Sequence, residues 1–213
     1  VTEDRRLARR IRALLERAGI SLEDSAGWAL STTSAATVLE RWLQCIELNF
    51  EYLAFMDLDK SPYFRLQPDG EEFATLIYRL ERDIIVHEKV TSGIDNYRAA
   101  ILARHQRLSG IGFTRDQSEK LLHLLDKLVD AAGHLLPLAN AEYYPASRYI
   151  SALIQSIRSL GLLQTLQQDP AGETVIQLLV DVESAAKSSP ISITWIEFRH
   201  WFAHALEHHY FQP

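Results

Sequence analysis

Three histidines near the end of the sequence have the spacing of a metal site. His200, His204 and His208 recur at intervals of four residues, so a helix would place them on one face. Two histidines at i and i+4 can bind one metal ion. A metalloprotease motif would also put Glu directly after the first His, where this chain has Trp201, and no third ligand is evident. We therefore favour a polar stripe that faces solvent or a partner, and keep His200 and His204 as candidate ligands only.

Other catalytic patterns are missing from the sequence. No Gly is followed by Lys, which excludes a Walker-type phosphate loop. None of the five lysines has an acidic residue two positions before it, which excludes the acidic-x-Lys pattern of many nucleases. No G-x-S-x-G elbow of a serine hydrolase is present. The sequence therefore predicts no catalytic residue and no cofactor in this chain.

Two further sets of polar residues look structural rather than reactive. Cys45 is the only cysteine, so no disulfide can form within the chain, and it falls on the apolar face of a predicted helix. We expect it to be a packed core thiol. Asp57 and Asp59 could form a pair of carboxylates, but they lie beside Lys60 in a stretch with two prolines. We expect both to be surface charges.

Charge is divided unevenly along the chain. Residues 1–20 carry six arginines against Glu3, Asp4 and Glu16, a net charge of +3. The whole chain carries −6, so residues 21–213 must carry −9. Because phosphate binding depends largely on Lys and Arg, this acidic part argues against a broad nucleic-acid surface.

Two groups of residues could still contact nucleic acid. The arginines near the start could meet phosphates, although a solvated helix face is the interpretation that we favour for most of them. These are Arg5, Arg6, Arg9, Arg10 and Arg12. The four tryptophans could stack on bases, but at helical spacing they more often belong to a core. These are Trp28, Trp42, Trp195 and Trp201.

Apolar periodicity predicts an all-α fold of about seven to nine helices, with at most a short strand remnant near the N-terminus. Capping-box patterns open two of the helices, at Thr114 and at Thr194, and Asp169-Pro170 opens a third. The predicted helices cover 4–18, 33–55, 71–90, 95–108, 114–136, 145–160, 169–187 and 194–208.

The sequence contains no apolar run near the roughly 20 residues of a membrane span, and no signal peptide is visible. We therefore expect no membrane association. The single cysteine fits a reducing, cytoplasmic setting.

The first quarter of the chain resembles a known family of DNA-repair proteins. The stretch "VTEDRRLARRIRALLERAGISLEDSAGWALSTTSAATVLERWLQCIELNFEYLAFMDL" is similar to AddB-type proteins, which carry a degenerate superfamily 1 helicase-like region and a PD-(D/E)XK nuclease domain. The matching positions are Val1-Thr2, Asp4-Arg5, Leu7 to Arg10, Gly19-Ile20, Asp24 to Gly27, Leu30 and Thr33. Glu3 and Trp28 depart from the family pattern. The later stretches "LGLLQTLQQDPAGETVIQLLVDVESA" and "ITWIEFRHWFAHALEHHYFQP" also resemble this family.

The resemblance implies that the chain is an internal piece of a larger protein. Residues 1–30 would be the edge of a helicase-like domain, and 31–213 an accessory helical domain, with a possible division near 109–114. Thr2, Arg5 and Arg9 would lie near a nucleic-acid-facing edge. The phosphate loop and the nuclease carboxylates would lie outside this piece. The parent protein would be a DNA exonuclease or helicase-like protein that contacts DNA and an AddA-like helicase-nuclease subunit.

These observations give one main hypothesis and two alternatives. The main hypothesis is a non-catalytic helical region that braces the lobes of an AddB-like repair protein. The first alternative is a helical protein–protein interaction module unrelated to DNA. The second is a metalloenzyme built on His200 and His204.

Overall fold

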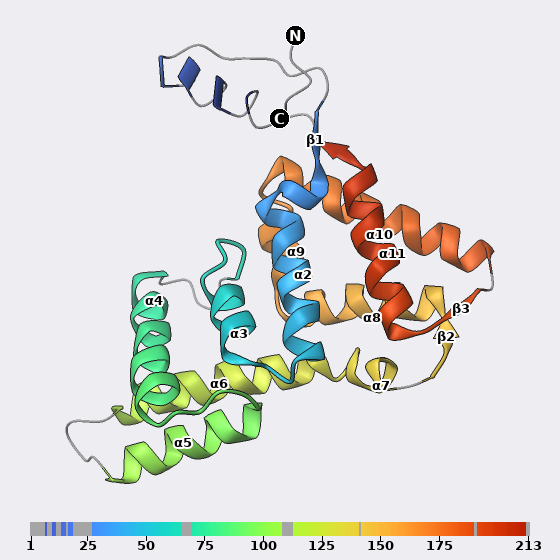
Figure 1. Ribbon diagram of the computed structural model, residues 1–213. Helices are drawn as coiled ribbons and strands as arrows, with labels where there is room; N and C mark the ends of the chain where they lie inside the picture. The colour runs from blue at the N-terminus through green and yellow to red at the C-terminus, as the bar shows by residue number, and fades with distance from the viewer. Residues whose placement is uncertain are drawn as a thin grey trace.

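A computed structural model shows an all-α protein with short strand pieces (Figure 1), as the periodicity predicts. The structure describes residues 7, 10, 11, 14, 15, 17 and 18, and then 27–64, 70–107, 113–140, 142–189 and 191–211. No helix among these residues combines the length and the apolar character needed to cross a bilayer.

The described residues form ten α-helices, slightly more than the sequence predicts. They are α2 (Ser34–Glu47), α3 (Tyr52–Asp59), α4 (Gly70–Arg79), α5 (Ile94–Arg107), α6 (Arg115–Ala132), α7 (Leu136–Ala139), α8 (Ala146–Ser159), α9 (Leu162–Leu166), α10 (Pro170–Ser188) and α11 (Trp195–His208). A 3₁₀-helix, η1 (Leu30–Thr32), precedes α2, and a π-helix, η2 (Leu80–His87), continues α4. The extra helices are short pieces such as α7 and α9, whose few residues are too brief for a periodic pattern.

Local sequence signals set the start of three long helices as predicted. Thr114 accepts a hydrogen bond from the backbone N–H of Gln117, whose side chain accepts one from the backbone N–H of Thr114. Thr194 and Glu197 form the same reciprocal capping box at α11. Asp169 caps α10, which begins with a proline. Each cap satisfies backbone donors that the first turn leaves without a helical partner.

One predicted helix is broken in the structure. The periodicity predicts a single helix over 33–55, but α2 ends at Glu47 and α3 begins at Tyr52. Asn49 and Phe50 between them adopt positive φ angles of 49° and 55°. A contact with α5 stabilises the chain at this break: the Tyr97 hydroxyl donates to the Phe50 carbonyl at 3.0 Å.

Two pairs of two-residue strands tie distant segments together. β1 (Trp28–Ala29) pairs antiparallel with β4 (Tyr210–Phe211), so that the two ends of the helical body lie side by side. β2 (Tyr144–Pro145) pairs antiparallel with β3 (Ser192–Ile193) at the opposite end of α11 (Figure 1).

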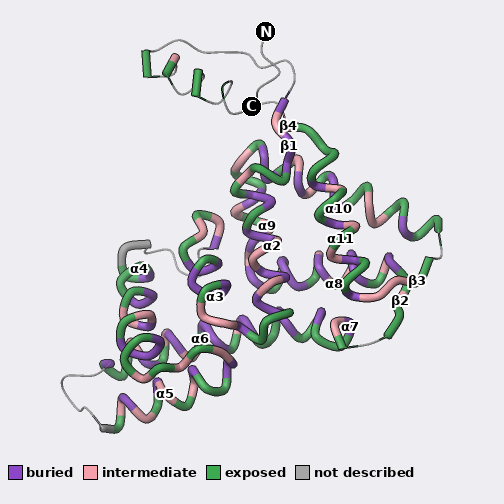
Figure 2. Tube along the Cα trace, viewed as in Figure 1, coloured by how far each residue is buried: buried purple, intermediate pink, exposed green. Residues whose placement is uncertain are grey.

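The core surrounds α2, which packs against α3, α10 and η1. Trp42 on this helix is fully buried, and its indole N–H donates to the Ser156 hydroxyl of α8 at 2.8 Å. α6 packs against both α5 and α8, and α10 packs against α8 and α9. Figure 2 shows the buried positions concentrated on the faces that these helices turn toward one another. The apolar stripes therefore meet in one contiguous cluster of buried side chains.

Candidate interaction surface

The predicted site residues at the start of the chain are not part of the described structure. Thr2, Arg5 and Arg9 all lie outside the described residues. Arg10 and Arg17, which are described, are exposed. The predicted nucleic-acid edge therefore stays a prediction.

The histidine stripe lies on the exposed side of α11, away from the buried Phe198 and Phe202. His204 and His208 stack with ring centroids 3.9 Å apart. His200 is also exposed, one turn earlier. Across the residues that the structure describes, no three His, Cys, Asp or Glu side chains come together as a possible metal site.

The last histidines help to end α11. The Nδ1 atoms of His208 and His209 lie 3.0 and 3.1 Å from the carbonyl oxygens of His204 and Ala205. A carbonyl oxygen only accepts, so each Nδ1 must donate. The Ala205 carbonyl is one of the last four of α11, which lack a donor within the helix, and the His209 ring supplies one. The His204 carbonyl lies one residue before these four and receives the His208 ring as a further donor. Of the stripe, His208 thus has a structural role at the C-terminus of the helix, and His209 shares it.

The structure confirms one of the two structural assignments and corrects the other. Cys45 is fully buried, and its burial raises the pKa of its thiol, as expected for a packed core side chain. Asp57 is exposed and pairs with Arg41 at 3.3 Å. Asp59, however, is not a surface charge: it is 5% exposed at the end of α3, and neither carboxyl oxygen has a hydrogen-bond partner.

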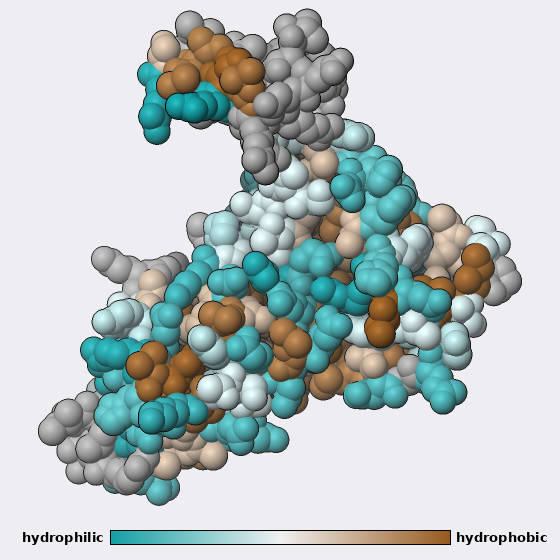
Figure 3. Space-filling model, in the orientation of Figure 1, coloured by the Kyte–Doolittle hydropathy of each residue, from teal (hydrophilic) through white to brown (hydrophobic). Residues whose placement is uncertain are grey.

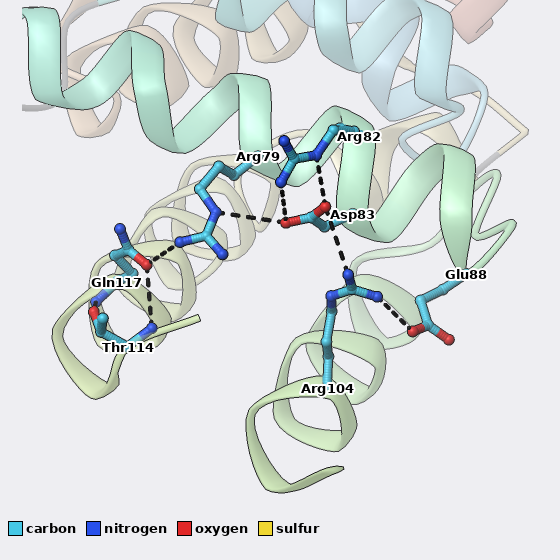
Figure 4. A network of polar contacts seen from close by, with 7 residues as sticks. All are labelled: Arg79, Arg82, Asp83, Glu88, Arg104, Thr114 and Gln117. Atoms are coloured by element: carbon cyan, nitrogen blue, oxygen red, sulfur yellow. Dashed lines mark hydrogen bonds and ion pairs between the residues drawn. The ribbon is translucent and has the colours of Figure 1, made fainter. Parts of the chain in front are cut away.

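A network of charged side chains, which the sequence did not reveal, joins η2 to α5 and α6 (Figure 4). Asp83 in η2 lies within 3.5 Å of three guanidinium groups, those of Arg79, Arg82 and Arg104. Arg104 also pairs with Glu88 at 3.0 Å. These pairs hold the π-helix against its neighbours. Only Arg79 and Asp83 have a spacing, i and i+4, that sequence inspection could have recognised.

Exposed apolar side chains gather around the first turn of α11. Tyr143, Ile191 and Ile196 are 65%, 58% and 62% exposed, and all three line hollows beside this turn. On the face that Figure 3 shows, apolar patches lie between polar ones. Exposed apolar side chains that line a hollow are typical of interaction sites.

Two hollows flank this turn. An open pocket of about 650 Å³, which we call the acidic–aromatic pocket, is lined by Glu47, Ala139, Glu142, Tyr143, Thr194, Trp195 and Ile196. A second hollow of about 400 Å³, the apolar groove, lies between the ends of α8 and α10, β3 and α11, and includes Ile191, Ile193 and Trp201. These two hollows together form the candidate interaction surface.

Charges beside the acidic–aromatic pocket are only partly paired. Arg199 of α11 lies 3.2 Å from a carboxyl oxygen of Glu40 and 3.7 Å from one of Glu47. Burial raises the pKa of Glu40, although Arg199 opposes this. Glu142 is exposed and forms no ion pair with another described residue.

Sequence inspection missed this surface because its parts come from four separate stretches of the chain. The only local signal is the capping box at Thr194, which fixes where α11 begins. No protein-family model matches the chain, and no curated protein and no solved structure matches it.

Proposed function

We propose that this chain is a non-catalytic helical module that is inserted into a DNA-repair protein similar to the AddB type, where it braces the neighbouring domains. One observation carries the proposal. β1 and β4 are paired, with Trp28 opposite Phe211 and Ala29 opposite Tyr210. A helical body that is reached and left through two adjacent strands can be inserted into a host domain without separating the host's own chain ends.

The sequence and the chemistry of the described residues support the same role. The stretches that resemble the AddB type include both of the paired strands. The described residues bring no three metal-binding side chains together, and the one described thiol is buried. A bracing module needs a rigid core rather than reactive groups, and a contiguous core is present.

The proposal is tested by shortening the parent protein at the paired strands. Residues 30–209 are replaced by Asn-Gly, so that a two-residue hairpin turn connects Ala29 to Tyr210. We expect the rest of the parent protein to fold and to keep its chemistry, while its ability to support repair of double-strand breaks is lost. In a control, the same turn joins Glu47 to Tyr210, which leaves α2 without α3 and α10, against which it packs, and this variant should misfold.

A separate experiment tests the DNA contact. In the parent protein, Arg5→Glu and Arg9→Glu should weaken DNA binding and reduce its dependence on salt, because each lost phosphate contact lowers the slope of log K against log salt by about 0.9. Arg98→Glu, at a partly exposed position of α5, serves as the control. A reading frame that contains neither a phosphate loop before this region nor an acidic-x-Lys nuclease motif after it would refute the repair assignment.

A second function, a protein–protein interaction module unrelated to DNA, is favoured by the exposed apolar side chains around the first turn of α11. It predicts that one partner protein is retained by the purified chain after nuclease treatment. Ile191→Ser and Ile196→Ser, which are exposed and cost little stability, should abolish that retention.

A further inference from the structure

We propose that the acidic–aromatic pocket binds a cationic side chain, Arg or Lys, that projects from a peptide segment of a partner protein. The inference goes beyond the inserted module, because it concerns the opposite end of α11 from the β1–β4 pair (Figure 1). It holds whether or not the chain belongs to a DNA-repair protein.

Charge complementarity favours a cation in this pocket. Glu47 and Glu142 line it, and none of the described residues that line it is Lys, Arg or His. Arg199 is not among the described residues that line the pocket, and it is shared between Glu40 and Glu47, with the shorter distance to Glu40. Glu142 is exposed and is paired with no other described residue, so a cation of a partner can pair with it.

Aromatic rings supply a second source of attraction for a cation. Tyr143 and Trp195 both line the pocket. Trp195 is held in place by ring contacts with Tyr149 and Phe198, at centroid distances of 6.2 and 5.7 Å. Lys and Arg are attracted to the faces of such rings, and Tyr143 is the more exposed of the two. Ile196 offers an apolar surface to the aliphatic stem of the same side chain.

Exposed apolar side chains beside the charged ones favour a peptide over a free cation. Tyr143 and Ile196, which line the pocket, are 65% and 62% exposed, and the apolar groove lies beside the same turn. A metal ion or a small amine would leave these side chains in water, whereas a peptide segment can cover them. The combination therefore favours a peptide.

The helix N-terminus opposes cation binding, but its effect is offset. Thr194 and Trp195 belong to the first turn of α11, where the helix dipole carries about half a positive charge. The Glu197 carboxylate accepts from the Thr194 backbone N–H at 2.7 Å and from its hydroxyl at 2.9 Å. This carboxylate balances the dipole locally, which leaves Glu47 and Glu142 to set the sign of the pocket.

The experiment uses the full chain and a short probe, N-acetyl-Leu-Arg-Gly-amide. The matched control peptide carries citrulline, which has nearly the shape of Arg but no charge. We expect the Arg peptide to shift the Trp195 indole N–H signal in nitrogen-15 NMR spectra and to bind roughly tenfold more tightly than the citrulline peptide, from the sum of one ion pair and one cation–π contact. A peptide with Lys in place of Arg should also bind, and added salt should weaken both.

Protein variants assign the effect to this pocket. Glu142→Gln and Tyr143→Ala, both at exposed positions, should each weaken the Arg peptide about threefold or more. The matched controls Glu119→Gln and Tyr78→Ala, exposed on α6 and α4, should leave binding unchanged. Equal binding of the Arg and citrulline peptides, or no effect of Glu142→Gln, would overturn the proposal. If the affinity of the peptide depends on its Leu side chain and not on its Arg side chain, the peptide binds in the apolar groove instead. That result would also overturn the proposal.

Discussion

Ser156 joins three helices through two hydrogen bonds. Its hydroxyl accepts from the indole N–H of Trp42 at 2.8 Å and donates to the carbonyl of Ala131 at 2.7 Å. All three residues are fully buried, so water cannot replace either bond. This one hydroxyl therefore fixes how α8 meets α2 and α6.

We expect Ser156→Ala to lower the free energy of unfolding by about 2–4 kcal/mol, because it leaves one buried donor and one buried acceptor without partners. Urea unfolding curves measure the loss. Ser118→Ala is the matched control: Ser118 is also buried, at 4% exposed, but its hydroxyl has no hydrogen-bond partner, and its removal should cost less than about 1 kcal/mol. Equal losses in the two variants would contradict this account.

Asp59 is the opposite case, a buried carboxyl group whose oxygens have no hydrogen-bond partner. Burial raises its pKa well above the ordinary value of 3.8, although the Lys60 charge opposes the shift. The folded protein therefore binds the proton more tightly than the unfolded chain. The stability that this gives is present in full below pH 3.8 and is lost as the pH rises from there toward the pKa of the folded state.

We expect Asp59→Asn to remove this pH dependence. The advantage of the variant over the natural chain should grow by up to about 1.4 kcal/mol for each pH unit above the ordinary pKa, until the pKa of the folded state is reached. Urea midpoints between pH 4 and pH 8 provide the measurement. Asp57→Asn, two residues earlier and exposed, should show no such trend. If the natural chain and the Asp59 variant respond to pH identically, the carboxyl group is not buried in solution.

At the scale of elements, the π-helix η2 depends on the ion-pair network in Figure 4. A π-helix is rare and needs tertiary contacts to persist. Asp83 is 4% exposed, and it connects η2 with Arg104 of α5, while Arg79 reaches Gln117 at the start of α6. Hydrogen bonds from Arg82 and the nearby guanidinium groups lower the pKa of Asp83. Its stability contribution is therefore present above pH 3.8 and is lost as the pH falls through the pKa of the folded state.

Removing this carboxylate should destabilise the protein strongly at neutral pH. We expect Asp83→Ala to cost about 3 kcal/mol, since it leaves Arg104 buried without one of its partners, and to cost less in acid. Denaturation at pH 7 and pH 3 tests both statements. Asp126→Ala breaks the exposed pair with Arg98 and should cost below about 1 kcal/mol. If Asp83→Ala loses more unfolding free energy than Asp126→Ala by the same amount at pH 7 and at pH 3, the loss does not come from the charge of the Asp83 carboxylate.

At the scale of the whole molecule, the β1–β4 pair brings together residues about 180 positions apart in the sequence. The backbone N–H of Leu30 also donates to the carbonyl of His209 at 2.8 Å, which extends the contact by one residue. The described helical body is thus entered and left through one pair of strands, β1 and β4, which we call the neck. The proposed insertion depends on this geometry.

A disulfide across this neck tests the closure directly. Residues that face each other on antiparallel strands lie about 4.5–5.5 Å apart, within the range that a disulfide spans. We expect the variant Ala29→Cys with Tyr210→Cys to form a disulfide in air and to gain roughly 3–5 kcal/mol over its reduced form, because the cross-link restricts a very long loop of the unfolded chain. Thiol titration and urea unfolding report the two effects. Ala29→Cys with Tyr78→Cys, whose partner lies on α4, should stay reduced.

The sequence by itself determined the elements that depend on neighbours a few residues away. Capping boxes at Thr114 and Thr194 and the Asp169-Pro170 pair fixed where three helices begin, and the structure places them there. Apolar periodicity predicted an all-α fold, and the structure is all-α with short strand pieces. These features were predictable because a cap or an i, i+4 contact is complete within one helical turn.

Only the tertiary structure decided the features that join distant segments. The break at Asn49 and Phe50 relies on Tyr97, and the burial of Asp59 was invisible in a stretch that looked like an exposed loop. The paired neck strands have two residues each, too few for an alternating pattern. The acidic–aromatic pocket combines the end of α2, the segment before β2 and the first turn of α11. Contacts of this kind arise only once the helices have packed, since no local interaction specifies which remote segment each residue will meet.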